Sequence, residues 1–121
     1  MPNHHRGEIE AELGGARRKL VLTLGALAEL EAAFGARDLV ALAERFGTGR
    51  LSARDLTLVI GAGLRGAGEN ISDDEVSALA VADGVTGYVR IAAALITATF
   101  GGEVAGEETR SRPLAQAPGE T

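Results

Sequence analysis

The sequence predicts an α+β protein that is mainly α-helical, with an N-terminal β-hairpin packed on a bundle of about five short helices. Hydrophobic and charged residues alternate between residues 7 and 23, as they do in half-buried strands. From residue 24 onward, hydrophobic residues recur every three or four positions, as on one face of a helix. Ser52 and Ser72 each begin a sequence typical of a helix N-terminus.

The predicted hairpin covers residues 7–23. Its first strand has an apolar face and an acidic face, made of Ile9, Ala11 and Leu13 and of Glu8, Glu10 and Glu12 respectively. Gly14 and Gly15 form the turn, because a two-residue hairpin loop needs positive φ at both positions. One face of the second strand holds Leu20, Leu22 and Leu24. The basic residues of this strand face the acidic residues of the first strand. A lone hairpin is marginal in water, so we expect its apolar face to rest on helices.

Two helices are predicted next. The first begins after Thr23 and ends at Gly35, and its apolar stripe is Leu24, Leu27, Leu30 and Phe34. The second covers residues 38–46 and ends at Gly47, with inward side chains from Leu39, Leu42 and Phe46.

The third helix begins at Ser52, whose spacing to Asp55 is that of a capping box. Its predicted buried face is Leu56, Val59, Ile60, Gly63 and Leu64. Gly61 and Gly63 each cost a helix about 1 kcal/mol relative to Ala. Close packing against another helix is the favoured explanation for these glycines, and the approach of a ligand is the alternative.

The fourth helix is expected to run from Ser72 to about Asp83 and Gly84. The last helix covers residues 85–100, and its broad apolar face holds Val85, Tyr88, Ile91, Ala92, Leu95 and Phe100. It is apolar enough to be the central helix of the bundle. Residues 7–100 therefore form the predicted domain. Residues 1–6 and the acidic segment 101–121 have too few apolar side chains to offset the entropy of ordering, so we expect both to be disordered.

The composition argues against several classes of protein. The net charge is −5, and a nucleic-acid binder usually carries a basic patch. The densest basic cluster, Arg17, Arg18 and Lys19, is interpreted as a solvated turn rather than as a phosphate site. There are no cysteines, which fits a reducing cytoplasm. Apolar segments fall short of the ~18 residues that span a bilayer, so no membrane partner is expected.

The sequence contains no recognisable pattern of catalytic, metal-binding or cofactor-binding residues. His4 and His5 lie in the N-terminal segment, and a metal site needs a further fixed ligand. Asp73, Asp74 and Glu75 occupy a first helical turn, where acids favour the helix dipole. The glycine pattern of residues 61–66 falls late in a helix, which is the wrong place for a dinucleotide fingerprint. We predict no catalytic residue, no metal site and no cofactor, and hence no enzyme.

Three segments carry a family resemblance. They are residues 22–31, LTLGALAELE, residues 38–46, DLVALAERF, and the stretch from Ser52 to Gly68, which ends GAGLRGAG. In this order, after a hairpin, they resemble the small tail proteins of gene transfer agents, a family grouped with phage tail assembly chaperones. The resemblance covers about residues 7–100.

The resemblance implies a tail assembly chaperone that acts on the tape-measure protein or the tail tube protein. The hairpin edge and an outward-facing Ile96 are the candidate contact surfaces. The alternative to the chaperone role is a structural tail tube component or a tail accessory component of the particle. The second alternative is a small helical regulatory or interaction module. Association of the chain with further copies of itself stays open.

Overall fold

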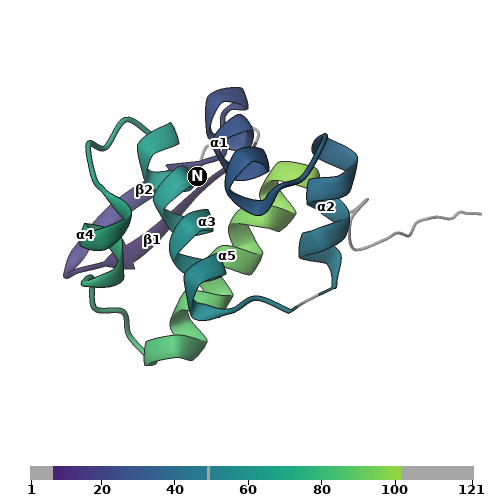
Figure 1. Cartoon of the computed structure of the whole chain (residues 1–121). Helices are drawn as coiled ribbons and strands as arrows, with labels where there is room; N and C mark the ends of the chain where they lie inside the picture. The colour runs from purple at the N-terminus through teal and green to yellow at the C-terminus, as the bar shows by residue number, and fades with distance from the viewer. Residues whose placement is uncertain (1–6, 49, 102–121) are drawn as a thin grey trace, which may run out of the picture.

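The structure, a computed structural model, describes residues 7–48 and 50–101. Within these residues a hairpin precedes five helices (Figure 1), and the elements are β1 (Glu8–Leu13), β2 (Ala16–Val21), α1 (Leu24–Phe34), α2 (Leu39–Gly47), α3 (Ala53–Gly66), α4 (Asp73–Ser77) and α5 (Gly84–Phe100). The predicted fold class is confirmed. The predicted disorder of residues 1–6 and 101–121 falls, apart from Gly101, outside the described residues. It stays a prediction, as do the limits of the domain.

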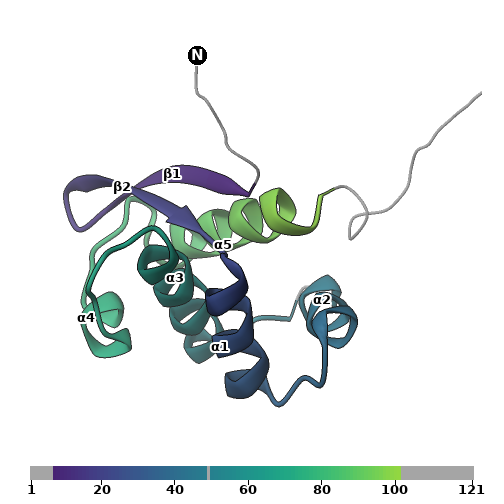
Figure 2. The same cartoon turned by 90° about the horizontal axis from the view of Figure 1, so that it is seen from above.

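The hairpin forms as its alternating pattern predicts. The strands pair antiparallel with Leu13 opposite Ala16, and Gly14 and Gly15 make the turn with φ values of 64° and 81°. Leu13 and Leu20 are fully buried on the face that turns inward. Figure 2 shows the hairpin as a layer over α3 and α5, which are the helices that β2 and β1 contact. The hairpin therefore rests on helices, as expected.

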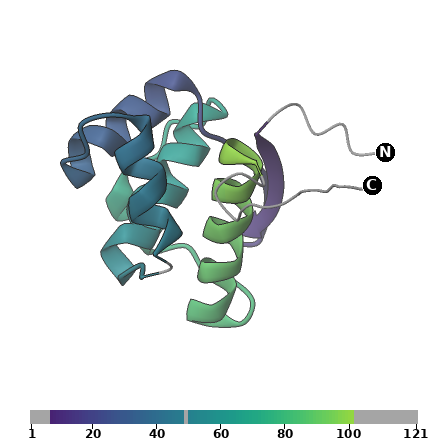
Figure 3. The same ribbon diagram turned by 90° about the vertical axis from the view of Figure 1, so that its right-hand side faces the viewer.

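The central helix of the fold is α3, which contacts β2, α1, α4 and α5. The expectation that the last helix would be central is wrong. Buried residues occupy α3 from Asp55 to Leu64, whereas those of α5 are Gly87, Ala92, Leu95 and Ile96. The apolar residues of α5 are spread around the helix. Its first turns extend beyond the helices that it packs against (Figures 1 and 3).

Glycine allows α3 to approach its neighbours closely. A Cβ at Gly63 would lie 2.6 Å from Cδ2 of Leu95 and 3.2 Å from Cβ of Leu20. Since methyl carbons pack at about 3.5–4.0 Å, a side chain at position 63 would displace the end of the Leu95 side chain and crowd Leu20. The explanation of Gly63 by close packing is confirmed.

Two apolar residues predicted to face inward are exposed in α1 and α2. Leu24 is 78% exposed, and Leu39 is 39% exposed. Each is the first residue of its helix, directly after the capping residues Thr23 and Asp38. Leu24 lies about 120° around the helix from the buried Leu30, because successive residues differ by about 100°. Ala26 is buried in place of Leu24.

α2 is attached to the other helices by an aromatic contact. The ring of Phe46 packs edge-on against Phe34 of α1, with 5.4 Å between ring centroids, and lies 6.5 Å from the ring of Phe100. Leu42 and Phe46 are buried as predicted, whereas Val40 is 67% exposed. α2 therefore packs against the fold along one narrow stripe.

α4 ends at Ser77, well before the predicted end near Asp83. The reason is that neighbouring carbonyl groups have partners from outside the helix. The hydroxyl of Tyr88 donates a hydrogen bond to the carbonyl of Leu79, and the amide of Gly14 donates one to the carbonyl of Ala80 at 2.8 Å. These bonds direct the chain away from a helical path.

α5 also departs from its predicted face. Val85 is 71% exposed because it lies in the first turn, which extends beyond the core. Tyr88, Ile91 and Phe100 are half-buried at the margin of the core. Ile96, expected to face outward, is 7% exposed and belongs to the core cluster with Ala92, one turn earlier.

Candidate functional site

The acidic residues of the α4 turn have structural roles. The carboxylate of Glu75 accepts a hydrogen bond from the amide of Ser72 at 2.8 Å, which completes the predicted capping box. Asp73 binds Arg65 at 3.0 Å. Among the described residues no group of three or more His, Cys, Asp or Glu side chains could hold a metal ion. His4 and His5 lie outside those residues, so the absence of a metal or catalytic site stays a prediction.

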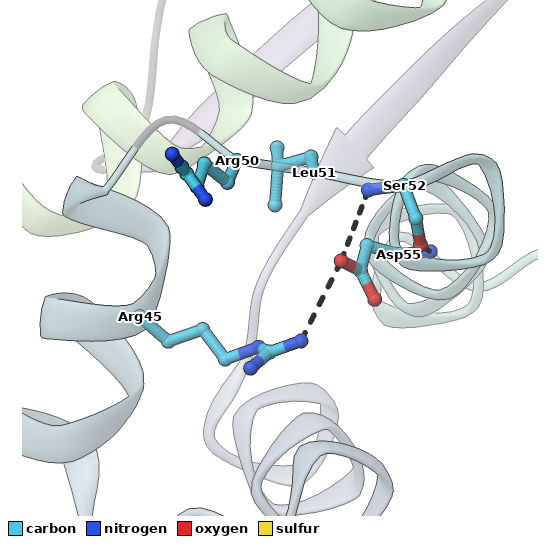
Figure 4. A pocket seen from close by; sticks show the side chains of 5 residues that line it. All are labelled: Arg45, Arg50, Leu51, Ser52 and Asp55. Atoms are coloured by element: carbon cyan, nitrogen blue, oxygen red, sulfur yellow. Dashed lines mark hydrogen bonds and ion pairs between the residues drawn. The ribbon is translucent and has the colours of Figure 1, made fainter.

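A shallow hollow of about 500 Å³ lies between the end of α2 and the start of α3 (Figure 4). It is lined by Arg45, Arg50, Leu51, Ser52 and Asp55. Ser52 and Asp55 bind each other's amides at 3.1 Å, as the predicted capping box requires. Asp55 is 7% exposed and lies 3.6 Å from a guanidinium nitrogen of Arg45. The polar groups of the hollow thus hold α3 to α2.

Arg65 joins three elements by its guanidinium group. It donates hydrogen bonds to the carbonyl of Ile71 and to Asp73, each at 3.0 Å, and to the carboxylate of Glu29. Partial burial tends to lower the pKa of Arg65, but hydrogen bonds and attraction from Glu29 and Asp73 outweigh it and raise the pKa. A Cβ at Gly61 would lie 2.6 Å from Oδ1 of Asp73, so this glycine makes room for the ion pair.

The basic cluster lies within β2, not in the predicted turn. Arg17 binds Glu10 at 3.0 Å, and Lys19 lies 3.7 Å from Glu8. The predicted facing of acids and bases is thereby confirmed. Arg18 donates to Glu69 at 2.6 Å and to the carbonyl of Leu13 at 2.8 Å, so it joins the hairpin to the segment before α4. Each cation of the cluster has a carboxylate partner, which argues against a phosphate site.

Exposed apolar side chains are the remaining feature that could bind a partner. Large ones on the described surface are Leu24, Leu39, Val40, Val85 and Val89. Ile96 is not among the contact surfaces, because it is buried. The hairpin edge stays a candidate, since β1 and β2 form a two-stranded sheet within the described residues.

These features define a small α+β protein whose ion pairs hold its elements together and whose surface carries several exposed apolar residues. No helix in the described part is long and apolar enough to cross a membrane. A family model described as phage tail tube protein, GTA-gp10, matches residues 6–102. The chain belongs to this family, which confirms its resemblance to the tail proteins of gene transfer agents and phages. No curated protein and no solved structure matches the chain.

Proposed function

We propose that this protein is a non-enzymatic structural component of a phage-like tail, built into or onto the tail tube of a gene transfer agent. The observation that carries the proposal is the family match across residues 6–102, which covers every described element. Its contacts in the particle are with tail tube subunits or with further copies of itself, and assembly takes place in the cytoplasm. Exposed apolar side chains such as Val85 and Val40 supply surface for such contacts.

Quantitative mass spectrometry of purified particles tests this role. A tube component is expected at a fixed stoichiometric ratio to the other tail proteins, and deletion of its gene should give particles without complete tails. Restoring the gene in trans should return full-length tails. If particles with normal tails contain no peptide of this chain, the structural role is wrong.

The second candidate is a tail assembly chaperone for the tape-measure protein. The observation that favours it is the helical architecture, since a two-stranded hairpin is the sheet present among the described residues. Tail tubes are typically rings of subunits whose β-sheets line the lumen, and two strands supply little of such a wall. Helices rich in Ala and Gly suit a partner that is itself an apolar helix.

Co-expression with the tape-measure protein separates the two roles. A chaperone should raise the soluble fraction of the tape-measure protein, co-purify with it, and be missing from finished particles. A structural component should be retained in the particles. If the tape-measure protein is equally soluble with and without this chain and no complex forms, the chaperone role is wrong.

A further inference from the structure

The N-terminal part of α5 projects beyond the core (Figures 1 and 3), and one of its faces is exposed. We call it the α5 face, and its residues are Asp83, Val85, Thr86, Val89 and Arg90. Val85 is 71% exposed and Val89 43% exposed, so two β-branched apolar side chains lie one turn apart in solvent. The cost of exposing them is recovered when another protein covers them.

A pair of opposite charges borders the two valines. Nη1 of Arg90 lies 3.3 Å from Oδ2 of Asp83, and the two side chains are 64% and 62% exposed. Asp83 precedes the helix with a φ of 70° and makes no capping bond with its side chain. Successive helical residues are rotated by about 100° around the helix axis. Thr86 therefore lies between the two valines on one side of the face and Arg90 on the other.

We propose that the α5 face binds the same face of a second copy of this chain, with the two helices antiparallel. The sequence spacing makes the face complementary to itself. A two-fold axis beside residue 87 places Val85 against the partner's Val89, and Val89 against the partner's Val85. Along the helix axis, the midpoint between Asp83 and Arg90 lies close to residue 87. The same two-fold axis therefore places Asp83 near the partner's Arg90, and Arg90 near the partner's Asp83. Thr86 meets the partner's Thr86 at the centre.

The interface between the two α5 faces is small, so the affinity of the dimer is low. Stable interfaces bury about 800 Å² on each partner, and two turns of one helix supply less. We therefore expect a dimer that dissociates on dilution. A two-fold contact closes on itself and cannot continue along a polar tube. The dimer is thus a state of the free protein, whether the chain serves as a tube component or as a chaperone, and it covers the valines before assembly.

Single-cysteine variants test the geometry directly, because the chain contains no cysteine. Thr86→Cys is expected to form a disulfide-linked dimer under mild oxidation, since the two thiols face each other at the axis. Thr97→Cys is the matched control, because Thr97 is exposed on the same helix but lies about three turns farther along. If Thr97→Cys cross-links as fast as Thr86→Cys, the proposed arrangement is wrong.

Charge reversal tests the pairing on the full chain by sedimentation equilibrium, over a range from about 10 µM to about 1 mM. Arg90→Asp places like charges across the axis twice, and it should weaken the dimer by about tenfold. The double variant Asp83→Arg with Arg90→Asp should restore the affinity to within about threefold. Circular dichroism checks that each variant is folded. A chain that stays monomeric throughout, or a double variant that fails to recover, would overturn the proposal.

Discussion

Gly66 at the end of α3 lies directly against the backbone of Val21 at the end of β2. A Cβ at position 66 would lie 2.1 Å from the carbonyl oxygen of Val21 and 3.2 Å from its carbonyl carbon. Because the obstructing atoms belong to the backbone, no rotation of a side chain can relieve the overlap. The hairpin and the central helix therefore meet at a point where glycine is required.

Gly66→Ala should lower the free energy of unfolding by about 2–3 kcal/mol, the usual cost of overpacking a tight site. The matched control is Gly25→Ala in α1, where the nearest atom to an added Cβ is Oγ1 of Thr23 at 3.8 Å. That control should be neutral or gain up to about 1 kcal/mol, because alanine favours helix. Urea denaturation followed by circular dichroism measures both. Equal effects of the two substitutions would contradict the proposed contact.

The attachment of α2 depends on Phe46, which is 5% exposed. Phe46→Leu removes the edge-on contact with Phe34 and should cost about 1–2 kcal/mol. Hydrogen exchange should accelerate in α2 more than in α3, because α2 has few other buried residues. Val40→Ala on the same helix is the control and should change stability by less than about 0.5 kcal/mol, since Val40 is 67% exposed.

The ion pair between Arg65 and Asp73 can be tested against a neighbouring acid. Asp73→Asn should destabilise the fold by about 0.5–1 kcal/mol, a small value because the carboxylate is 42% exposed. Asp74→Asn, one residue later on the exposed side of the turn, removes a first-turn acid without the contact to Arg65, so it should cost less than Asp73→Asn. A double-mutant cycle with Arg65→Met isolates the coupling, and a coupling energy of zero would contradict the ion pair.

The pH dependence of this coupling follows from the raised pKa of Arg65. A cation whose pKa is higher in the folded state contributes fully below its unfolded pKa, and the contribution is lost as pH rises through the folded pKa. The ordinary pKa of arginine already lies above the pH range of most stability measurements, and that of Arg65 is raised further. The effect of Arg65→Met on stability should therefore be constant between about pH 6 and about pH 10. A loss of coupling within that interval would contradict it.

Arg18 and Arg17 differ in burial, although they are neighbours in β2. The side chain of Arg18 is 22% exposed and that of Arg17 is 66% exposed. Arg18→Gln should cost about 1 kcal/mol, because it removes a charged donor from both Glu69 and the carbonyl of Leu13. Arg17→Gln should cost less than about 0.5 kcal/mol. Thermal unfolding of the two variants at equal ionic strength compares them, and equal losses would refute the difference.

The features that could be predicted from sequence are those with a local physical cause. The starts at Thr23, Ser52 and Ser72 were predictable because a capping side chain binds an amide three residues later. The Gly14–Gly15 turn was predictable because its backbone conformation is open to few other residues. Alternation and helical spacing identified most of the core, including Leu13, Leu30 and Ile60.

The errors concern contacts between distant parts of the chain. The end of α4 depends on Tyr88 and Gly14, which donate hydrogen bonds to the carbonyls of Leu79 and Ala80 just after the helix. Periodicity shows which residues share a helical face, but not how far the helix extends past its neighbours, so it does not predict the exposure of Val85. The partners of Arg65 lie as far as 36 residues away, and spacing rules do not reach them.

The position of Gly63 between Leu20 and Leu95 has a consequence for synthesis of the chain. One wall of this contact comes from the start of the sequence and the other from near its end. A chain emerging from the ribosome can form its hairpin and α3 early and pack α3 against β2 and α1, but the side of α3 that faces α5 stays uncovered until α5 has emerged. Contacts of such long sequence separation are slow to form, so we expect the contact between α3 and α5 to form after the hairpin has packed on α3.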